Sequence, residues 1–152
     1  MISANSGIIY FYFLIKPFFF PHRSRLKSFL KQLFKKEGKE VETINYIFCT
    51  DAYLLKLNKT HLNHNTYTDI ITFELSPKGE PLTADIYISV ARVKENAATF
   101  HTSFQRELHR VIFHGALHLC GYKDKTKEQS QQMRAKEELY LNHYFVPRGT
   151  GR

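Results

Sequence analysis

Cysteine is scarce in this chain of 152 residues, which contains only Cys49 and Cys120. Two cysteines are too few for the disulfide framework of a small secreted domain, so we expect two reduced thiols and a cytoplasmic protein. Acidic residues are also in the minority, because 14 Asp and Glu stand against 22 Lys and Arg and give a formal net charge of +8. This excess favours polyanionic partners such as nucleic acid, although it leaves the fold open.

A long uninterrupted hydrophobic run is also missing. The most apolar stretch, residues 8–20 (IIYFYFLIKPFFF), is interrupted by Lys16 and Pro17. It is too short to span a bilayer, no basic segment precedes it, and it lacks the small-residue cleavage site of a secretory signal. Because Tyr, Phe and Ile favour strands, we expect residues 8–14 to form a buried first strand and we expect no membrane anchor.

Repeats, low-complexity tracts and linkers are missing too, so residues 1–152 are expected to form one domain. Apolar runs predict further strands at residues 43–50, 69–75 and 84–88, with the last two paired antiparallel through a turn rich in Pro and Gly. The predicted fold class is therefore α+β, a single domain with a mixed, roughly four-stranded sheet packed with about five helices. Its metal site is expected at the end of the penultimate helix.

The helices are predicted from apolar spacing and capping residues. The first helix is expected at residues 23–37, ended by Gly38, and the second runs from a cap at Asp51 through about Asn58. A third follows Ser89, with Val93, Ala97 and Phe100 inward. The last two are expected from Thr102, with Gln105 completing a capping box, and at 126–143, with a capping box formed by Thr126 and Gln129.

The first of these helices is strongly basic on its outer faces. Lys27, Lys31 and Lys35 are our candidate RNA-binding residues, because they could form a surface that attracts phosphates. The alternative is a basic face that is simply solvated.

Residues 114–124, HGALHLCGYKD, contain the strongest functional pattern. His114 and His118 are four residues apart and therefore project from the same side of a helix. Gly121 can end that helix by adopting a positive φ, which would turn Asp124 back toward the two imidazoles. Two His on one helix face also occur by chance. Three protein ligands with one open position, however, are typical of a catalytic zinc site.

The spacing matches the zincin pattern H-E-x-x-H-x-x-G-x-x-H except at two positions. Gly115 stands where the catalytic Glu would be, and Asp124 stands where the third His would be. Zincin peptidases use that Glu as their general base, so Gly115 disfavours peptidase activity.

Several motifs together resemble one family, the YbeY-type endoribonucleases, also called rRNA maturation factors. The family pattern H-G-x-L-H-L-x-G-Y-D-H aligns with residues 114–124, and its T-D-V-L-S-F and G-D-I strands resemble residues 68–73 and 84–86. A Met-x-x-x-Glu near the end matches Met133 and Glu137. The resemblance extends from about residue 41 over most of the chain. It implies a zinc-dependent, single-strand-directed endoribonuclease that serves rRNA processing and ribosome biogenesis.

Two positions depart from the family pattern. The third zinc ligand, usually His, is Asp124 here, and an Arg in the loop before the T-D strand is replaced by Leu62. Asp is a legitimate zinc ligand, so the resemblance implies a surviving site with an altered metal preference. His61 and His64 are nearby polar candidates for the lost Arg contact, or plain surface residues.

The sequence therefore predicts one Zn²⁺ held by His114, His118 and Asp124, with Mn²⁺ or another divalent ion as a substitute. The expected partners are single-stranded or ribosomal RNA and the ribosome. No general base and no oligomeric state follow from the residues. Two alternatives stay open: a zinc hydrolase of another class, such as an atypical peptidase, and a non-catalytic RNA or ribosome assembly factor with a structural metal.

Overall fold

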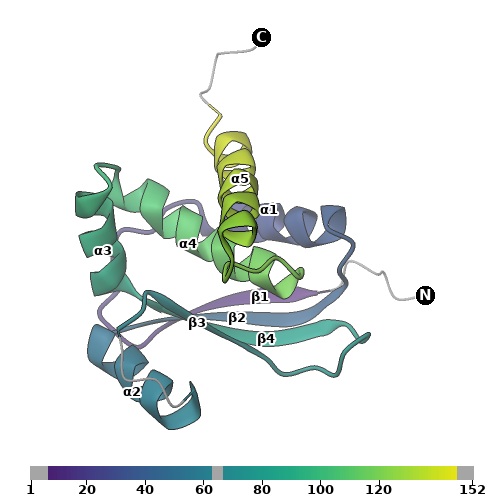
Figure 1. The fold of residues 1–152 in the computed structure, drawn as a ribbon, viewed down its shortest axis with the longest axis horizontal. Helices are drawn as coiled ribbons and strands as arrows, with labels where there is room; N and C mark the ends of the chain where they lie inside the picture. Colours follow the sequence, from purple (N-terminus) through teal and green to yellow (C-terminus); the bar gives the residue numbers. More distant parts are fainter. Residues whose placement is uncertain (1–6, 63–66, 147–152) are drawn as a thin grey trace.

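The structure, a computed structural model, describes residues 7–62 and 67–146. Its elements follow in the order β1 (Ile8–Phe13), α1 (Arg23–Lys36), β2 (Val41–Cys49), α2 (Asp51–Leu62), β3 (Ile70–Glu74), β4 (Leu82–Ser89), α3 (Val90–Thr99), α4 (Phe104–Leu119) and α5 (Lys127–Tyr144). This arrangement, shown in Figure 1, confirms the predicted α+β class.

The four strands form one mixed sheet in the order β1-β2-β4-β3. β1 and β2 are parallel, as are β2 and β4, so each of these pairs is joined by a crossover that contains helix. β3 and β4 are antiparallel and are joined by a short turn, as predicted. β3 is therefore an edge strand, and its outer side is open to form one wall of a cleft.

Helices cover the two faces of the sheet unequally (Figure 1). α1, α4 and α5 lie on one side, where the main core forms from residues such as Ile9, Phe48 and Ile86 of the sheet and Leu30 and Phe113 of the helices. α2 lies on the opposite side and covers only a small cluster around Cys49, Leu54 and Ile71. Of these helices, α4 lies deepest in the molecule.

The first strand differs from the prediction. We expected residues 8–14 to be buried, but β1 ends at Phe13 and lies at the edge of the sheet. Ile9 packs into the core, whereas Ile8, Tyr10 and Tyr12 are 45%, 38% and 47% exposed on the other face. α2 packs against residues of β2, β3 and β4, so it does not cover that part of the sheet.

The predicted helix boundaries needed local corrections. The N-cap of α4 is Ser103, whose hydroxyl accepts from the Arg106 amide, so the helix does not begin at Thr102. The cap before α2 is Thr50, and Asp51 instead forms an ion pair with Arg92 at 2.7 Å. In both places a neighbouring hydroxyl takes the role that we had assigned by spacing alone.

Other predicted features were confirmed or shifted at helix ends. Ser89 caps α3 and Thr126 with Gln129 forms the capping box of α5, as expected. Phe100, predicted to be inward, follows the end of α3 and is 55% exposed. α2 continues to Leu62, beyond the predicted end at Asn58. Within the described ranges, no helix is long and apolar enough to cross a membrane.

Candidate active-site cleft

The C-terminal half of α4 presents the two histidines because its other faces are buried. Leu108, Val111, Ile112 and Leu119 are at most 4% exposed and pack toward the sheet. The helix is tied to the sheet by the buried Tyr46 hydroxyl, which donates to the Ile112 carbonyl at 2.8 Å. The site therefore stands on a rigid element.

Gly115 lies where α4 packs against Ile70 of β3 and Ile86 of β4. A Cβ placed on Gly115 would approach Ile70 Cδ1 at 2.9 Å and Ile86 Cγ2 at 3.1 Å. The residue that is Glu in zincins is thus replaced by a glycine packed so closely that a side chain there would displace Ile70 and Ile86. Because residue 115 is glycine, it supplies no base to the site.

The turn after α4 brings Asp124 back to the helix, as predicted. Gly121 has a φ of 105°, a left-handed conformation that glycine adopts without strain. The Tyr122 amide then donates to the Leu117 carbonyl at 3.1 Å, which folds the chain back on α4. As a result, Asp124 Oδ2 lies 3.3 Å from His114 Nε2.

The other nitrogen of His114 is held by a buried carboxylate. His114 Nδ1 lies 2.6 Å from Glu137 Oε2, and Glu137 on α5 is 1% exposed. Burial alone would raise the pKa of Glu137, but the hydrogen bond from His114 and the charge of Arg110 outweigh it and lower that pKa. An ionised Glu137 fixes the proton of His114 on Nδ1, which leaves Nε2 to face Asp124 and the cleft.

Arg110 completes a buried ionic network behind the histidine. Its guanidinium contacts Glu107 at 2.7 Å and Glu137 at 3.1 Å, and it lies 3.8 Å from Asp69. Despite the cost of desolvating Arg110, the carboxylates of Glu107 and Glu137 raise its pKa. Asp69 is different, because burial outweighs the charge of Arg110 and raises the pKa of its carboxyl group.

These groups open into one cleft of about 490 Å³ between α4 and the edge strand β3. Its lining comprises Asn58, Tyr67, Thr68, Asp69, Ile70, Ile71, Thr72, Arg110, His114, His118 and Asp124. The lining contains two carboxylates, Asp69 and Asp124, and one guanidinium, that of Arg110. Glu107 and Glu137 already form ion pairs with this guanidinium. The cleft is acidic although the chain as a whole is basic.

The predicted ligands are brought together only in part. His114 and Asp124 form a close pair, whereas the His118 ring stacks parallel to His114 with centroids 6.3 Å apart. Within residues 7–62 and 67–146, no three His, Cys, Asp or Glu side chains are close enough as they stand to hold an ion. The three-ligand set stays a prediction. It requires the exposed His118 side chain to turn toward the pair.

The three candidate lysines do not all line one groove. Lys31 and Lys35 line a separate groove of about 460 Å³ with Ser28, Gln32 and Lys39. The ammonium of Lys27 instead lies 5.4 Å from the Phe11 ring centroid, in a cation–π contact. Of the loop candidates, His61 is in α2 and packs edge-on against Phe73. The side chains of Leu62 and His64 lie outside the described residues.

Sequence reasoning missed Arg110 and the role of Glu137. Glu137 belonged to a recognised motif but had no chemical function assigned. The available signal was helical spacing, because Glu107, Arg110 and His114 follow one another at intervals of three and four residues. Nothing in that spacing identifies the partner on α5.

Comparison with known proteins defines the class to which this fold and cleft belong. The family model described as Endoribonuclease YbeY matches residues 20–145, well over half of the sequence. The chain belongs to the YbeY family.

Individual relatives agree with this assignment. The chain is 48% identical over 120 residues to a Cytophaga hutchinsonii protein named Endoribonuclease YbeY, covering 79% of this chain and 84% of the relative. A Christiangramia forsetii protein of the same name is 46% identical over 120 residues, with 79% and 83% coverage. A Thermotoga maritima protein solved in solution matches with a TM-score of 0.62 and 29% identity, covering 89% of this chain and 87% of that one.

Proposed function

We propose that this protein is a metal-dependent endoribonuclease that cleaves single-stranded RNA during rRNA maturation. Membership in the YbeY family supports the reaction. The observation that carries the metal dependence is the orientation of His114. Its Nδ1 is engaged by Glu137, and its Nε2 points at Asp124 across 3.3 Å.

That separation fits two ligands of one ion. Zinc binds nitrogen and oxygen at about 2.0–2.2 Å, so two ligand atoms of a tetrahedral site lie roughly 3.3–3.5 Å apart. The carboxylate–histidine arrangement behind the pair is the one that orients metal-binding imidazoles. His114, His118 and Asp124 would hold the ion, with Zn²⁺ as the expected metal and Mn²⁺ as a substitute because Asp is a harder ligand than His.

The charge of the cleft supports the same proposal. The phosphates of RNA would be repelled by Asp69 and Asp124, and Arg110 is largely neutralised by its own partners. A bound divalent cation would reverse the local charge and could supply hydroxide or polarise a phosphoryl oxygen. Glu137 orients His114, and Glu107 and Glu137 hold Arg110 beside the cleft. The edge strand β3 forms the opposite wall of the cleft.

The peptidase alternative is disfavoured because its general base is missing. That base would occupy position 115, which is a glycine packed closely against Ile70 and Ile86. The assembly-factor alternative differs only in turnover. In that case the protein would bind RNA without cutting it, and loss of a metal ligand would leave binding unchanged.

The test begins with protein purified without added metal, whose metal content is measured. Digestion of single-stranded RNA is then compared with and without chelator, beside digestion of casein as the peptidase control. We expect about one ion per chain and RNA cleavage that the chelator abolishes and added zinc restores. Cleavage that persists in chelator would contradict the proposal, as would turnover of casein alone. We expect ribosomal RNA and the ribosome as the partners, to be tested by co-sedimentation with ribosomal subunits.

A further inference from the structure

Glu37 occupies a place that the helix before it does not favour. It is the C-cap residue of α1, where the negative end of the helix dipole disfavours a carboxylate. Its side chain is only 11% exposed, and burial on its own would raise its pKa. Three donors outweigh that burial and lower the pKa of Glu37. These donors belong to segments far away in the sequence.

The first donor is in the turn that carries Asp124. The Tyr122 hydroxyl donates to Glu37 Oε1 at 2.9 Å. Backbone hydrogen bonds to α4 hold the start of this turn at Gly121 and Tyr122, and its end is held by the Gln129 side chain at Lys125 and Thr126. The hydroxyl of Tyr122 therefore adds a side-chain anchor between the start of the turn, two residues before Asp124, and Glu37 at the end of α1.

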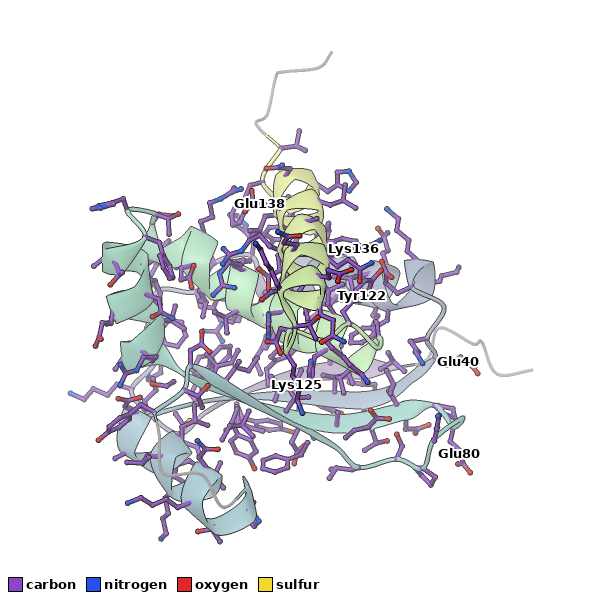
Figure 2. All side chains as sticks on the ribbon, in the orientation of Figure 1. Glu40, Glu80, Tyr122, Lys125, Lys136 and Glu138 are labelled. Carbon is purple, nitrogen blue, oxygen red and sulfur yellow. The ribbon has the colours of Figure 1, made fainter. Side chains whose placement is uncertain are left out.

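The other two donors are on α5. Tyr140 donates to Glu37 Oε2 at 2.5 Å, and Lys136 donates to the same oxygen at 3.2 Å. Lys136 immediately precedes Glu137, the partner of His114. Figure 2 shows Tyr122 and Lys136 close together beside α5, and the Lys136 ammonium lies 5.6 Å from the Tyr122 ring centroid.

We propose that Glu37 is a positioning residue of the cleft, which fixes the Asp124-bearing turn through Tyr122 and the Glu137-bearing face of α5 through Lys136 and Tyr140. The carboxylate has two oxygens, and each faces one of these two segments. It thereby sets the distance between the turn and α5. Asp124 on the turn lies beside Nε2 of His114, and Glu137 on α5 lies beside Nδ1. The part of this inference that concerns metal affinity rests on the proposed function.

Three single variants separate the two arms of the contact. Tyr122→Phe removes only the hydroxyl that reaches the turn, and Glu37→Gln removes the charge shared by both arms. Tyr140→Phe is the matched control. It removes a hydroxyl that donates to the same carboxylate, but it leaves the hydrogen bond from Tyr122 on the turn in place. Urea unfolding of all three variants reports the purely structural cost.

The first measurement needs no metal. Amide hydrogen exchange at Tyr122 and Lys125, whose amides donate to the Leu117 carbonyl and to the Gln129 side chain, is compared in the metal-free proteins. We expect faster exchange in Tyr122→Phe and Glu37→Gln and parent-like exchange in Tyr140→Phe, even if Tyr140→Phe loses as much stability. Parent-like exchange at these amides in both Tyr122→Phe and Glu37→Gln would overturn the proposal.

The second measurement is zinc affinity, obtained by titration against a competing chelator. Residues that orient metal ligands typically change affinity by about 10- to 100-fold. We expect a loss of at least about tenfold in Tyr122→Phe and a further loss when Glu37→Gln is added, because Glu37→Gln also weakens the contacts to Lys136 and Tyr140 on α5. Parent-like affinity in Tyr122→Phe would overturn the inferred link to the metal. If the parent itself binds no zinc but the exchange result holds, the proposed function fails while Glu37 keeps its positioning role.

Discussion

Two of the cavities in the described part of this molecule are nearly equal in size but differ in charge and in the burial of their ionisable groups. The cleft beside α4 measures about 490 Å³ and the groove beside α1 about 460 Å³. The cleft is acidic and is backed by Arg110 and Glu137, which are 14% and 2% exposed at their side chains. The groove is basic, and its lysines are exposed. Size therefore does not distinguish them, whereas buried, mutually fixed ionisable groups do.

The difference also explains how a chain of charge +8 can carry an acidic candidate site. Surface lysines attract a polyanion over distances of about a Debye length, roughly 8–10 Å at physiological salt. They need no fixed geometry for this effect. Chemistry at one phosphodiester needs fixed groups, which the network behind His114 provides. We infer that the groove gathers RNA and that the cleft reacts with it.

The largest effect is expected from the cleft ligands. His118→Ala should abolish stoichiometric zinc binding and RNA cleavage, because it removes one of only three candidate ligands. Asp124→Ala should weaken binding clearly, whereas Asp124→His should retain or strengthen it by restoring a neutral nitrogen ligand. Calorimetric titration with a competing chelator measures all three. Parent-like zinc affinity in Asp124→Ala would remove Asp124 from the ligand set.

The next effect concerns the network that distinguishes the cleft from the groove. Arg110→Ala leaves Glu107 and Glu137 buried without their cation, and breaking such a pair costs about 3–5 kcal/mol of unfolding free energy. Lys35→Ala in the exposed groove is the control and should change stability by less than about 0.5 kcal/mol. Urea unfolding measures both variants. Equal effects would mean that the buried network does not differ energetically from an exposed surface.

A pH titration separates loss of the cleft from unfolding of its scaffold. His109 lies on α4, is 2% exposed, and has its pKa lowered to about 4, chiefly by burial. Because its unfolded pKa is higher, at about 6.5, the unfolded state binds the proton first as the pH falls. Stability should therefore decrease from about pH 6.5 to about pH 4, by on the order of 3 kcal/mol.

His109→Leu should flatten this pH dependence, as measured by urea unfolding at pH 7 and pH 4.5. A curve equally steep in the variant would show that other groups dominate the acid sensitivity. If RNA cleavage is lost at a pH where the free energy of unfolding is still unchanged, the loss is caused by the cleft and not by unfolding.

The sequence predicted the parts of the site that depend on local spacing. The His114–His118 interval, the helix-ending Gly121 and the capping box at Thr126 are each readable within one turn of chain, and each of these positions has the predicted local structure. The contacts that orient the site join residues 23 apart in the case of His114 and Glu137, and 85 apart in the case of Glu37 and Tyr122. No periodicity within one element specifies such pairs.

The burial of β1 failed as a prediction for a related reason. An apolar strand at the centre of a sheet and an aromatic strand at its edge have similar composition, so strand order decides which of them is covered. Strand order depends on the crossovers through α1 and α2, which local patterns do not encode. The lysines of α1 show the same limit. Their equal spacing along the helix does not reveal that Lys27 contacts Phe11 of β1.

The smallest effect is expected from those lysines, and it tests whether the groove gathers RNA. Replacing Lys31 and Lys35 with Gln should weaken RNA binding to a similar degree for all sequences, since phosphate contacts carry no sequence information. Loss of two contacts to a single strand should also flatten the slope of log affinity against log salt by about 1.4. Cleavage at saturating RNA should be unchanged, because the cleft is intact.

Lys27→Gln is the matched control. The Lys27 ammonium lies over the Phe11 ring and does not line the groove, so the salt slope of this variant should stay close to the parent's. Fluorescence anisotropy with a labelled single-stranded RNA at several salt concentrations measures the slopes. If Lys27→Gln alone changes the slope as much as the double variant does, the whole helix face binds RNA, and the groove has no special role.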